Sequence, residues 1–299
     1  MRYVSYVGKV AMSETAEHNF EHLPPAAAGL GHIFARPKIL AALCLIVLAG
    51  LGWSYVGLLV AGANKTFDGL GTSVFQTLCG PLLNPLWSLG GVTAVVAMWG
   101  AMVLAMMLPS AGPMIMTYAG IADTAARKHE YVISPLVLAA GYATIWFGFS
   151  IVAALAQIML MQAAWLDTSL ASASGLFSGA IFVGAGLYQF SALKHACLNR
   201  CQHPFPFFFA NWATTTRGVF RLGLKQGVFC LGCCWAMMLV MFAVGVMNVI
   251  WMAGLGMVMT IEKILTGRRF SHVVGMALII AGAVIIIAAF AAHWPAKTS

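Results

Sequence analysis

The stretch VVGMALIIAGAVIIIAAFAA, from Val273 to Ala292, decides the fold class. It contains no charged or hydrogen-bonding side chain from one end to the other. A helix needs about 20 largely apolar residues to cross the hydrocarbon core of a bilayer, which is roughly 30 Å thick. The stretch is long enough for one crossing and therefore predicts a transmembrane helix.

The composition of the whole chain points the same way. Of its 299 residues, 61% are hydrophobic and only 8% are charged, with a mean hydropathy of +0.90. An ordinary soluble domain is about 25% charged, so the composition excludes a soluble enzyme. The lipid-facing backbone must satisfy its own hydrogen bonds, which requires helices or a closed barrel. The apolar runs are long and continuous rather than short and alternating, and this excludes a β-barrel.

We therefore predict an all-α fold, a polytopic transmembrane helical bundle of about seven spans. The predicted spans cover residues 39–61, 92–118, 133–160, 175–193, 224–246, 249–264 and 273–292. We expect Pro109 and Pro113 to break or kink the second span. Residues 74–89 are too short for a span and predict a surface-lying or re-entrant segment. Only Met247 and Asn248 separate the fifth and sixth spans, which could form one hairpin.

Two parts of the chain differ in composition. Residues 1–36 form a polar N-terminal tail with scattered charges, and residues 37–295 are predicted to be a single transmembrane helical domain. The tail lacks a basic start followed directly by an apolar stretch and a small-residue cleavage site, so we expect no cleaved signal peptide.

The positions of the basic residues test the predicted spans and their orientation independently. With a cytoplasmic N-terminus, 14 of the 16 Lys and Arg residues fall in cytoplasmic pieces, because only Lys65 and Lys297 lie outside. Such a bias is expected of a correctly threaded chain with its C-terminus outside. It predicts a multi-pass protein of a bacterial inner (plasma) membrane. The net charge of +8 is explained by topology and by contact with anionic lipids of the bilayer, so no nucleic-acid partner is needed.

Five of the seven cysteines lie in two groups near predicted cytoplasmic helix ends. Cys44 and Cys79 stand alone in apolar surroundings, as small packing residues do. The clustered ones are Cys197 and Cys201 in KHACLNRCQHP, and Cys230, Cys233 and Cys234 in FCLGCCW.

The spacings within these groups predict a metal site. Residues three or four apart share one face of a helix, and the two carrier spans are sequential and antiparallel. Their thiolates could build a four-sulfur cage, in which His195 or His203 completes or replaces a corner. Thiolate-rich cages select zinc, Cu(I) or iron–sulfur clusters. Thiol–disulfide exchange and plain packing remain as alternatives, whereas a structural disulfide is disfavoured in a reducing cytosol.

Methionine favours copper over zinc as the metal ion. The chain has 18 methionines, and thioether with thiolate favours Cu(I). The candidates are Met102, Met106, Met107 and Met238, although methionine also fills apolar gaps.

Glu262 and Lys263 end the sixth predicted span on the same side as the cysteines. An acidic residue there is costly unless it is paired or functional. Glu262 could be a ligand, a support for a ligand, or the partner of Lys263 or Lys194.

Four stretches together resemble a known family. They are WGAMVLAMMLPSAGPM (Trp99–Met114), YQFSALKHACLNRCQHP (Tyr188–Pro204), GVFCLGCCWAMMLVMFAVGVMNVIWM (Gly227–Met252) and the pair Glu262, Lys263. Their order is similar to that in the uncharacterised bacterial family of predicted metal-binding integral membrane proteins, domain of unknown function 2182. The resemblance covers about residues 87–290. It implies metal binding without an established reaction.

The expected function is that of a metal-handling membrane protein, which binds, delivers or transports a soft cation, with copper favoured. A metallochaperone or a metalloenzyme would be its protein partner. We expect no enzyme activity. The sequence shows no nucleotide-binding loop, phosphorylation motif or soluble catalytic domain, so any transport would be driven by a gradient or by exchange. Two alternatives stay open. One is a redox protein using dithiol exchange, with Tyr188 and Gln189 serving a quinone or haem, and the other is a membrane scaffold or assembly subunit.

Overall fold

The computed structural model describes residues 37–63, 89–128, 132–163, 165, 174–246 and 248–293. All regular secondary structure in these ranges is helical, which confirms the predicted all-α class. The helices are α2 (Pro37–Ala63), α4 (Leu89–Ala126), α5 (Pro135–Gln162), α6 (Gly175–Tyr188), α7 (Ala192–Gln202), α8 (Pro204–Ala210), α9 (Thr216–Val244), α10 (Val249–Ile264) and α11 (Arg269–His293).

Polar side chains cap the N-termini of the helices that carry the site. The Ser191 hydroxyl accepts from the Lys194 backbone N–H at 3.1 Å and starts α7. Thr215 caps α9 and Asn248 caps α10 in the same way. These caps satisfy backbone donors that the first helical turn leaves free. Gly245, at φ 98°, ends α9 in a conformation that a side chain would disfavour, and the chain turns directly into α10.

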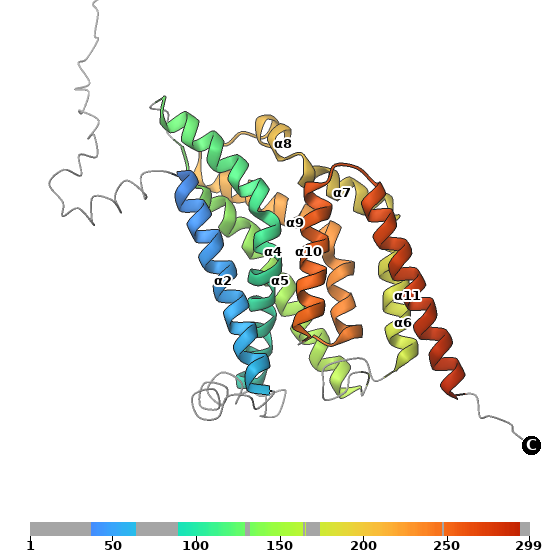
Figure 1. Ribbon diagram of the computed structural model, residues 1–299. Coiled ribbons are helices and arrows are strands. Elements are labelled where there is room, and N and C mark those ends of the chain that lie inside the picture. Colours follow the sequence, from blue (N-terminus) through green and yellow to red (C-terminus); the bar gives the residue numbers. More distant parts are fainter. Residues whose placement is uncertain are drawn as a thin grey trace, which may run out of the picture.

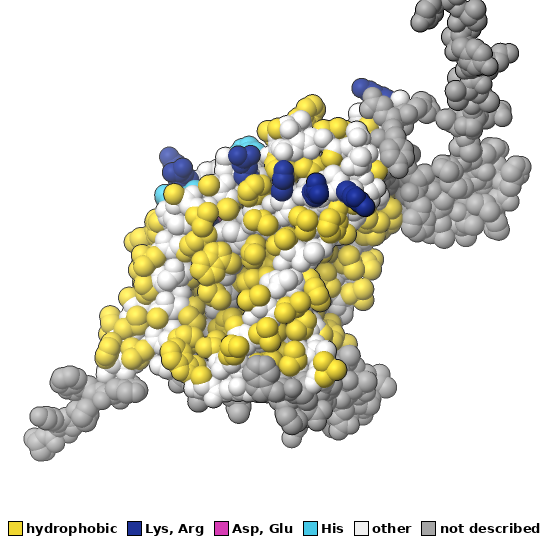
Figure 2. Space-filling view, turned by 180° about the vertical axis from the view of Figure 1, so that it is seen from behind, with side chains coloured by type: hydrophobic (Ala, Val, Ile, Leu, Met, Phe, Trp, Pro, Cys, Tyr) yellow, Lys and Arg dark blue, Asp and Glu magenta, His cyan; other side chains and the backbone are white. Residues whose placement is uncertain are grey.

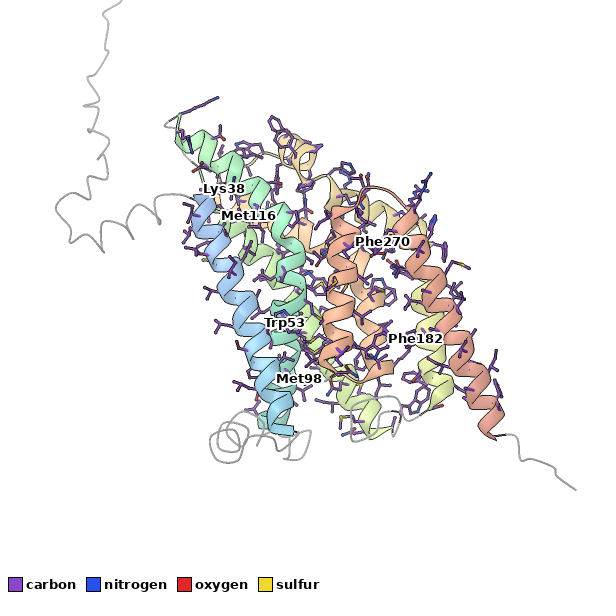
Figure 3. All side chains as sticks on the ribbon, viewed as in Figure 1. Lys38, Trp53, Met98, Met116, Phe182 and Phe270 are labelled. Carbon is purple, nitrogen blue, oxygen red and sulfur yellow. The ribbon has the colours of Figure 1, made fainter. Side chains whose placement is uncertain are left out.

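The helices form a bundle with α4 and α9 at its centre and α2 and α11 on its outside (Figure 1). α2 packs along α4, α5 packs along α9, and α11 packs along α6. Trp53 lies between α2 and α4 (Figure 3), and its indole N–H donates to the Ala105 carbonyl oxygen at 2.9 Å. The described chain starts and ends at opposite ends of the bundle (Figure 1).

Glycines allow two of these pairs to approach closely. Gly141 of α5 faces Gly223 of α9, and a Cβ added at Gly223 would lie 3.0 Å from the Gly141 Cα. On α6, a Cβ added at Gly186 would lie 2.8 Å from the carbonyl oxygen of Gly275 in α11. Small residues of this kind let membrane helices pack backbone to backbone. The glycine-rich face of α6 therefore packs against a helix of the same chain.

Five described helices are long and apolar enough to cross a membrane: α2, α4, α5, α9 and α11. The bent pair of α6 and α7 gives a sixth candidate. α10 has 16 residues and is shorter than these candidates. The structure therefore supports a membrane bundle with five or six such spans, and the count of seven stays a prediction.

The structure differs from the predicted elements in several places. α4 continues to Ala126, past the predicted end at residue 118, and α9 starts at Thr216, before the predicted start at residue 224. α4 runs continuously through Pro109 and Pro113, so these prolines do not break it, although its axis leans over at the upper end in Figure 1. The predicted span 175–193 is divided, because α6 ends at Tyr188 and α7 starts at Ala192 with a bend of 64° between them. The predicted tail 1–36, and residues 74–88 of the predicted re-entrant segment, lie outside the described residues.

The surface separates apolar from basic side chains. Figure 2 shows hydrophobic side chains over most of one face and the Lys and Arg side chains in a band near one end of the molecule. The outward side chains of α2 and α11 are apolar and exposed, such as Ile46 at 68% and Ile287 at 67%. Such exposed apolar faces are expected where helices contact lipid.

Candidate metal centre

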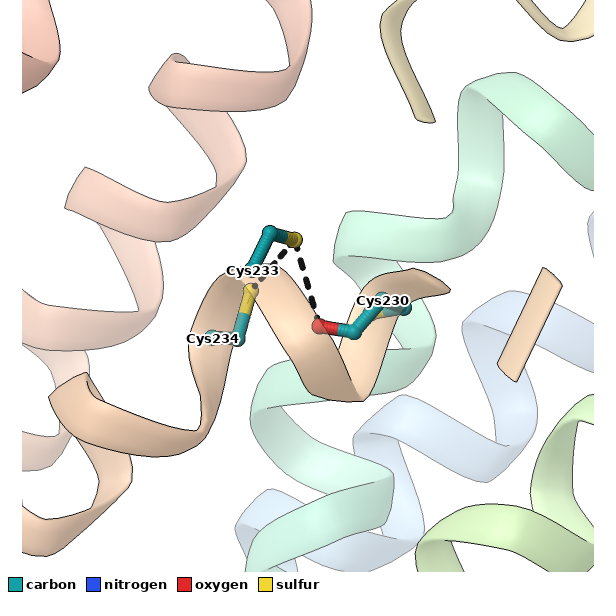
Figure 4. A group of neighbouring side chains, drawn as sticks. All are labelled: Cys230, Cys233 and Cys234. Carbon is teal, nitrogen blue, oxygen red and sulfur yellow. Dashed lines mark hydrogen bonds between the residues drawn. The ribbon is translucent and has the colours of Figure 1, made fainter. Parts of the chain in front are cut away.

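Three cysteines of α9 form a compact thiol cluster, which consists of Cys230, Cys233 and Cys234 (Figure 4). Their sulfur atoms all lie within 4.8 Å of one another, and each side chain is at most 2% exposed. The Sγ atoms of Cys233 and Cys234 are 3.3 Å apart, and the Cys233 thiol donates to the Cys230 carbonyl oxygen at 3.1 Å. The helix produces this grouping, since positions i, i+3 and i+4 share one face.

A positive charge lies against one member of the thiol cluster. The Lys263 ammonium, from the last turn of α10, donates to the Cys230 sulfur at 3.0 Å and to the Ser110 hydroxyl at 2.6 Å. Lys263 is only 7% exposed, so solvent screens this contact weakly. A lysine ammonium beside a cysteine favours the thiolate, which is the form that binds metals.

Tyr142 of α5 approaches the same sulfur atom. Its hydroxyl lies 3.0 Å from the Cys230 Sγ and 3.1 Å from the Met107 carbonyl oxygen. A hydroxyl carries one proton, so it can donate to a Cys230 thiolate or to the carbonyl, and a Cys230 thiol can donate to it. Cys230 thus has polar partners from α5 and α10 in either protonation state.

The second predicted cysteine group lies on α7, which packs against α9. Cys201 of α7 and Cys230 of α9 line the same small cavity. Cys197 faces the backbone beside the cluster, because a Cβ added at Gly232 would lie 2.6 Å from its sulfur. α7 therefore lies beside the thiol cluster, with Cys201 and Cys230 lining one cavity and Cys197 next to Gly232. Among the described residues, the compact group itself holds the three α9 cysteines, so the four-sulfur cage stays a prediction.

A buried ion pair joins α7 to α10. The Lys194 ammonium donates to the Glu262 carboxylate at 2.8 Å, and the two side chains are 0% and 2% exposed. The Gln202 amide also donates to the carbonyl oxygens of Glu262, at 2.8 Å, and Leu265, at 2.7 Å. Of the roles foreseen for Glu262, the structure shows the pairing with Lys194. Lys263 contacts Cys230 and Ser110 instead.

The histidines lie apart from the sulfur atoms. Within the described ranges, the group of metal-binding side chains contains the three α9 cysteines and no histidine. The His195 ring contacts that of His272 with centroids 5.3 Å apart. His203 is exposed, and its ring nitrogen hydrogen-bonds the Asn199 carbonyl oxygen at 3.1 Å.

The predicted methionines are all in the core. Met102, Met106 and Met107 of α4 and Met238 of α9 are at most 2% exposed. Met106 packs close to Gly256 of α10, because a Cβ added at Gly256 would lie 3.5 Å from the Met106 Cγ. Burial on central helices is equally expected of packing and of thioether ligands, so it does not separate the two roles.

Residues 96–285, well over half of the 299, match the PpoB2 family, which is described as copper chaperone. The chain belongs to the PpoB2 family. The matched range contains all the cysteines, histidines and methionines discussed as ligands, together with Glu262. No curated protein and no solved structure matches the chain.

The motifs resembled a family of predicted metal-binding membrane proteins. Membership in the PpoB2 family supports the link to metals, but the family has a different name from the one that the motifs suggested. Together with the thiol cluster it fits a copper-related role. The sequence did not indicate Tyr142 or Ser110 as members of the site. A tyrosine and a serine inside apolar spans are weak signals taken singly, and only the fold brings them to Cys230 and Lys263. Cys79 lies outside the described residues.

Proposed function

We propose that the chain is a membrane protein that binds Cu(I) at the thiol cluster and passes it to a metallochaperone or metalloenzyme. The observation that carries the proposal is the cluster itself, three buried sulfur atoms within 4.8 Å of one another on one helix face. The family description supports copper as the cargo.

Copper is favoured over zinc by the kinds of ligand present. Structural zinc sites are almost always tetrahedral with four protein ligands, whereas soft thiolates and thioethers select Cu(I). The thiol cluster supplies three sulfur atoms. Buried methionines such as Met237 and Met238 follow on the same helix. Sulfur is thus the dominant donor around the centre.

Lys263 offsets part of the charge of the bound state. Thiolates that hold a monovalent cation leave net negative charge in a buried place, and unpaired buried charge is costly. The ammonium lies 3.0 Å from the Cys230 sulfur and supplies the opposite sign.

The remaining expectations form part of the same proposal. The chain works as one transmembrane unit of a bacterial inner membrane, with the N-terminus in the cytoplasm and the C-terminus outside. It handles the metal without catalysing a reaction. The band of basic side chains near one end (Figure 2) supports a cytoplasmic placement of that end.

A redox function is the second candidate, because the Cys233 and Cys234 sulfur atoms are only 3.3 Å apart. Thiol–disulfide exchange proceeds by attack of a thiolate on a disulfide sulfur, so it needs thiols that lie close together. This function requires thiols that cycle between dithiol and disulfide without any metal.

The deciding experiment is the copper and zinc content of the detergent-purified protein by elemental mass spectrometry. A variant with Cys230, Cys233 and Cys234 changed to serine is compared with the control Cys44→Ser, whose thiol lies alone on α2. We expect copper in the unmodified protein and in the control, and its loss in the triple variant.

Two outcomes would count against the proposal. Copper that persists in the triple variant would place the binding site elsewhere. Metal-free protein in which thiols of the cluster cycle to a disulfide would support the redox candidate instead.

A further inference from the structure

A small crevice opens beside the thiol cluster, between α4, α5, α7, α9 and α10. Its volume is about 20 Å³, and its lining includes Met114, Cys201, Gln226, Cys230 and Lys263. A space for one water molecule needs roughly 10–15 Å³ on this measure, so the crevice can hold a single atom or ion of that size. It brings two thiols and one thioether of three different helices to one place.

The side chains of the crevice differ in their access to solvent. Cys201 of α7 is half-buried, whereas Cys230 is only 2% exposed. Cys201 and Cys230 line the same crevice, so the crevice connects the partly exposed helix α7 with the buried cluster. This order makes Cys201 the outermost sulfur of the series.

The crevice also contains the buried side-chain amide of Gln226. Gln226 is 1% exposed, and among the described residues its amide nitrogen has no hydrogen-bond acceptor. A buried donor of this kind normally has a partner, and its lack points to a group that the crevice receives. A thiolate that has just bound a metal ion, or a water molecule travelling with the ion, would provide the acceptor.

We propose that this crevice is the entrance to the thiol cluster, and that Met114, Cys201 and Cys230 form a first position for Cu(I) within it. The proposal rests on the copper function proposed above. Two thiolates and a thioether are ligands that select Cu(I). Cys230 belongs both to this first position and to the thiol cluster, so the ion can move inward without leaving it.

The inward step is a ligand exchange with no net redox change. The bond between copper and the Cys201 sulfur breaks as a bond to the Cys233 or Cys234 sulfur forms, and copper stays Cu(I). The incoming thiol loses a proton and the departing Cys201 thiolate gains one.

The test is the rate and extent of Cu(I) loading into the purified protein, without oxygen, from a coloured Cu(I) chelator. Cys201→Ser and Met114→Leu are compared with controls of the same chemistry, Cys44→Ser and the exposed Met276→Leu. We expect both crevice variants to load more slowly than their controls, while the final copper content at the cluster stays unchanged. Slow loading with full occupancy is not produced by a misfolded protein.

A second measurement isolates the first position. In a Cys233→Ser, Cys234→Ser background, the remaining copper should be held by Cys201, Cys230 and Met114. Further change of Cys201 or Met114 should then weaken Cu(I) binding by about tenfold or more, since even groups behind a ligand cost 10–100-fold in affinity.

The possible outcomes distinguish failure of the entrance proposal from failure of the proposed copper function. If the unmodified chain takes up no Cu(I), the copper function itself fails. If the cluster loads normally and both crevice variants load at the rate of their controls, the entrance is disproved and the copper function stands.

Discussion

Lys263 is the residue whose removal best tests the electrostatics of the centre. Its ammonium is the described cation in contact with the Cys230 sulfur, at 3.0 Å, and it also donates to Ser110. A neutral side chain of similar length would keep the packing and remove the charge. The electrostatic and steric parts of its role can therefore be separated.

We predict that Lys263→Met weakens Cu(I) binding by about tenfold, the lower end of the range for groups that support a ligand. The cause is the loss of the positive charge that favours the Cys230 thiolate. Competition with a Cu(I) chelator measures the change. Lys225→Met, on the exposed side of α9, is the control and should bind copper normally. Equal affinities in the two variants would remove Lys263 from the site.

The seam between α6 and α11 gives a prediction at the scale of elements. A Cβ added at Gly186 would lie 2.7 Å from Ile279 Cγ1 and 2.8 Å from the Gly275 carbonyl oxygen. Gly184, on the same helix, has open space around it. Overpacking a close contact typically costs about 1–3 kcal/mol, and Ala in open space gains up to about 1 kcal/mol over Gly in a helix.

We therefore expect Gly186→Ala to lower the unfolding temperature in detergent and Gly184→Ala to keep or raise it. Thermal unfolding followed by circular dichroism compares the two variants directly. The same response to both substitutions would mean that α6 and α11 do not pack as closely as described.

The attachment of α7 to α10 gives a second prediction at this scale. Lys194 and Glu262 form a pair with almost no solvent exposure. Breaking a buried pair by removing one partner costs about 3–5 kcal/mol, because a buried charge is left uncompensated, whereas replacing both partners is often neutral. We expect Lys194→Met to destabilise the protein strongly, and Lys194→Met with Glu262→Met to recover most of the loss.

Chemical unfolding in detergent measures these differences. The control is Arg127→Ala, which removes the exposed pair with Asp123, and exposed pairs are worth at most about 1 kcal/mol. A double variant no more stable than Lys194→Met would show that the two side chains are not coupled.

At the scale of the whole molecule, the basic residues predict the orientation in the membrane. If α10 and the bent pair α6–α7 both cross, the described helices supply seven crossings, and the chain ends lie on opposite sides. We expect a C-terminal alkaline phosphatase fusion, which is active only outside the cytoplasm, to be active and a C-terminal fluorescent protein fusion to be dark. An inactive phosphatase fusion and a fluorescent protein fusion that is bright would contradict the proposed membrane topology.

The sequence predicted the helices well because long apolar runs require them. α10 begins and ends where its pattern indicated, at Val249 and Ile264. The break between Tyr188 and Ala192 was missed, because the apolar pattern continues to Leu193 and only the cap residue Ser191 marks the new helix. The helix boundary is determined there by the cap at Ser191, whereas a prediction from hydropathy follows only the apolar residues.

The candidate site was predictable where spacing along one helix determines it. Positions 230, 233 and 234 share a face whatever surrounds them, and the structure brings their sulfur atoms together. Contacts between helices were harder to foresee. Whether Cys197 or Cys201 of α7 points at the cluster depends on the bend before α7 and on the rotation of that helix against α9.

The short helix α10 also bears on how the protein enters its membrane during synthesis. It has 16 residues and carries the acidic Glu262 and the basic Lys263 in its last turn, before Ile264 ends it. Acidic and basic residues make a segment harder for the translocon to insert, by about 2.5–3.5 kcal/mol each at the centre of a helix and less near its end. α9 comes immediately before it and is long and apolar. We expect the ribosome to deliver the two as a hairpin, in which α9 inserts first and α10 follows it. The residue that supplies the charge beside Cys230 would then reach the bilayer only after the cysteines are already there.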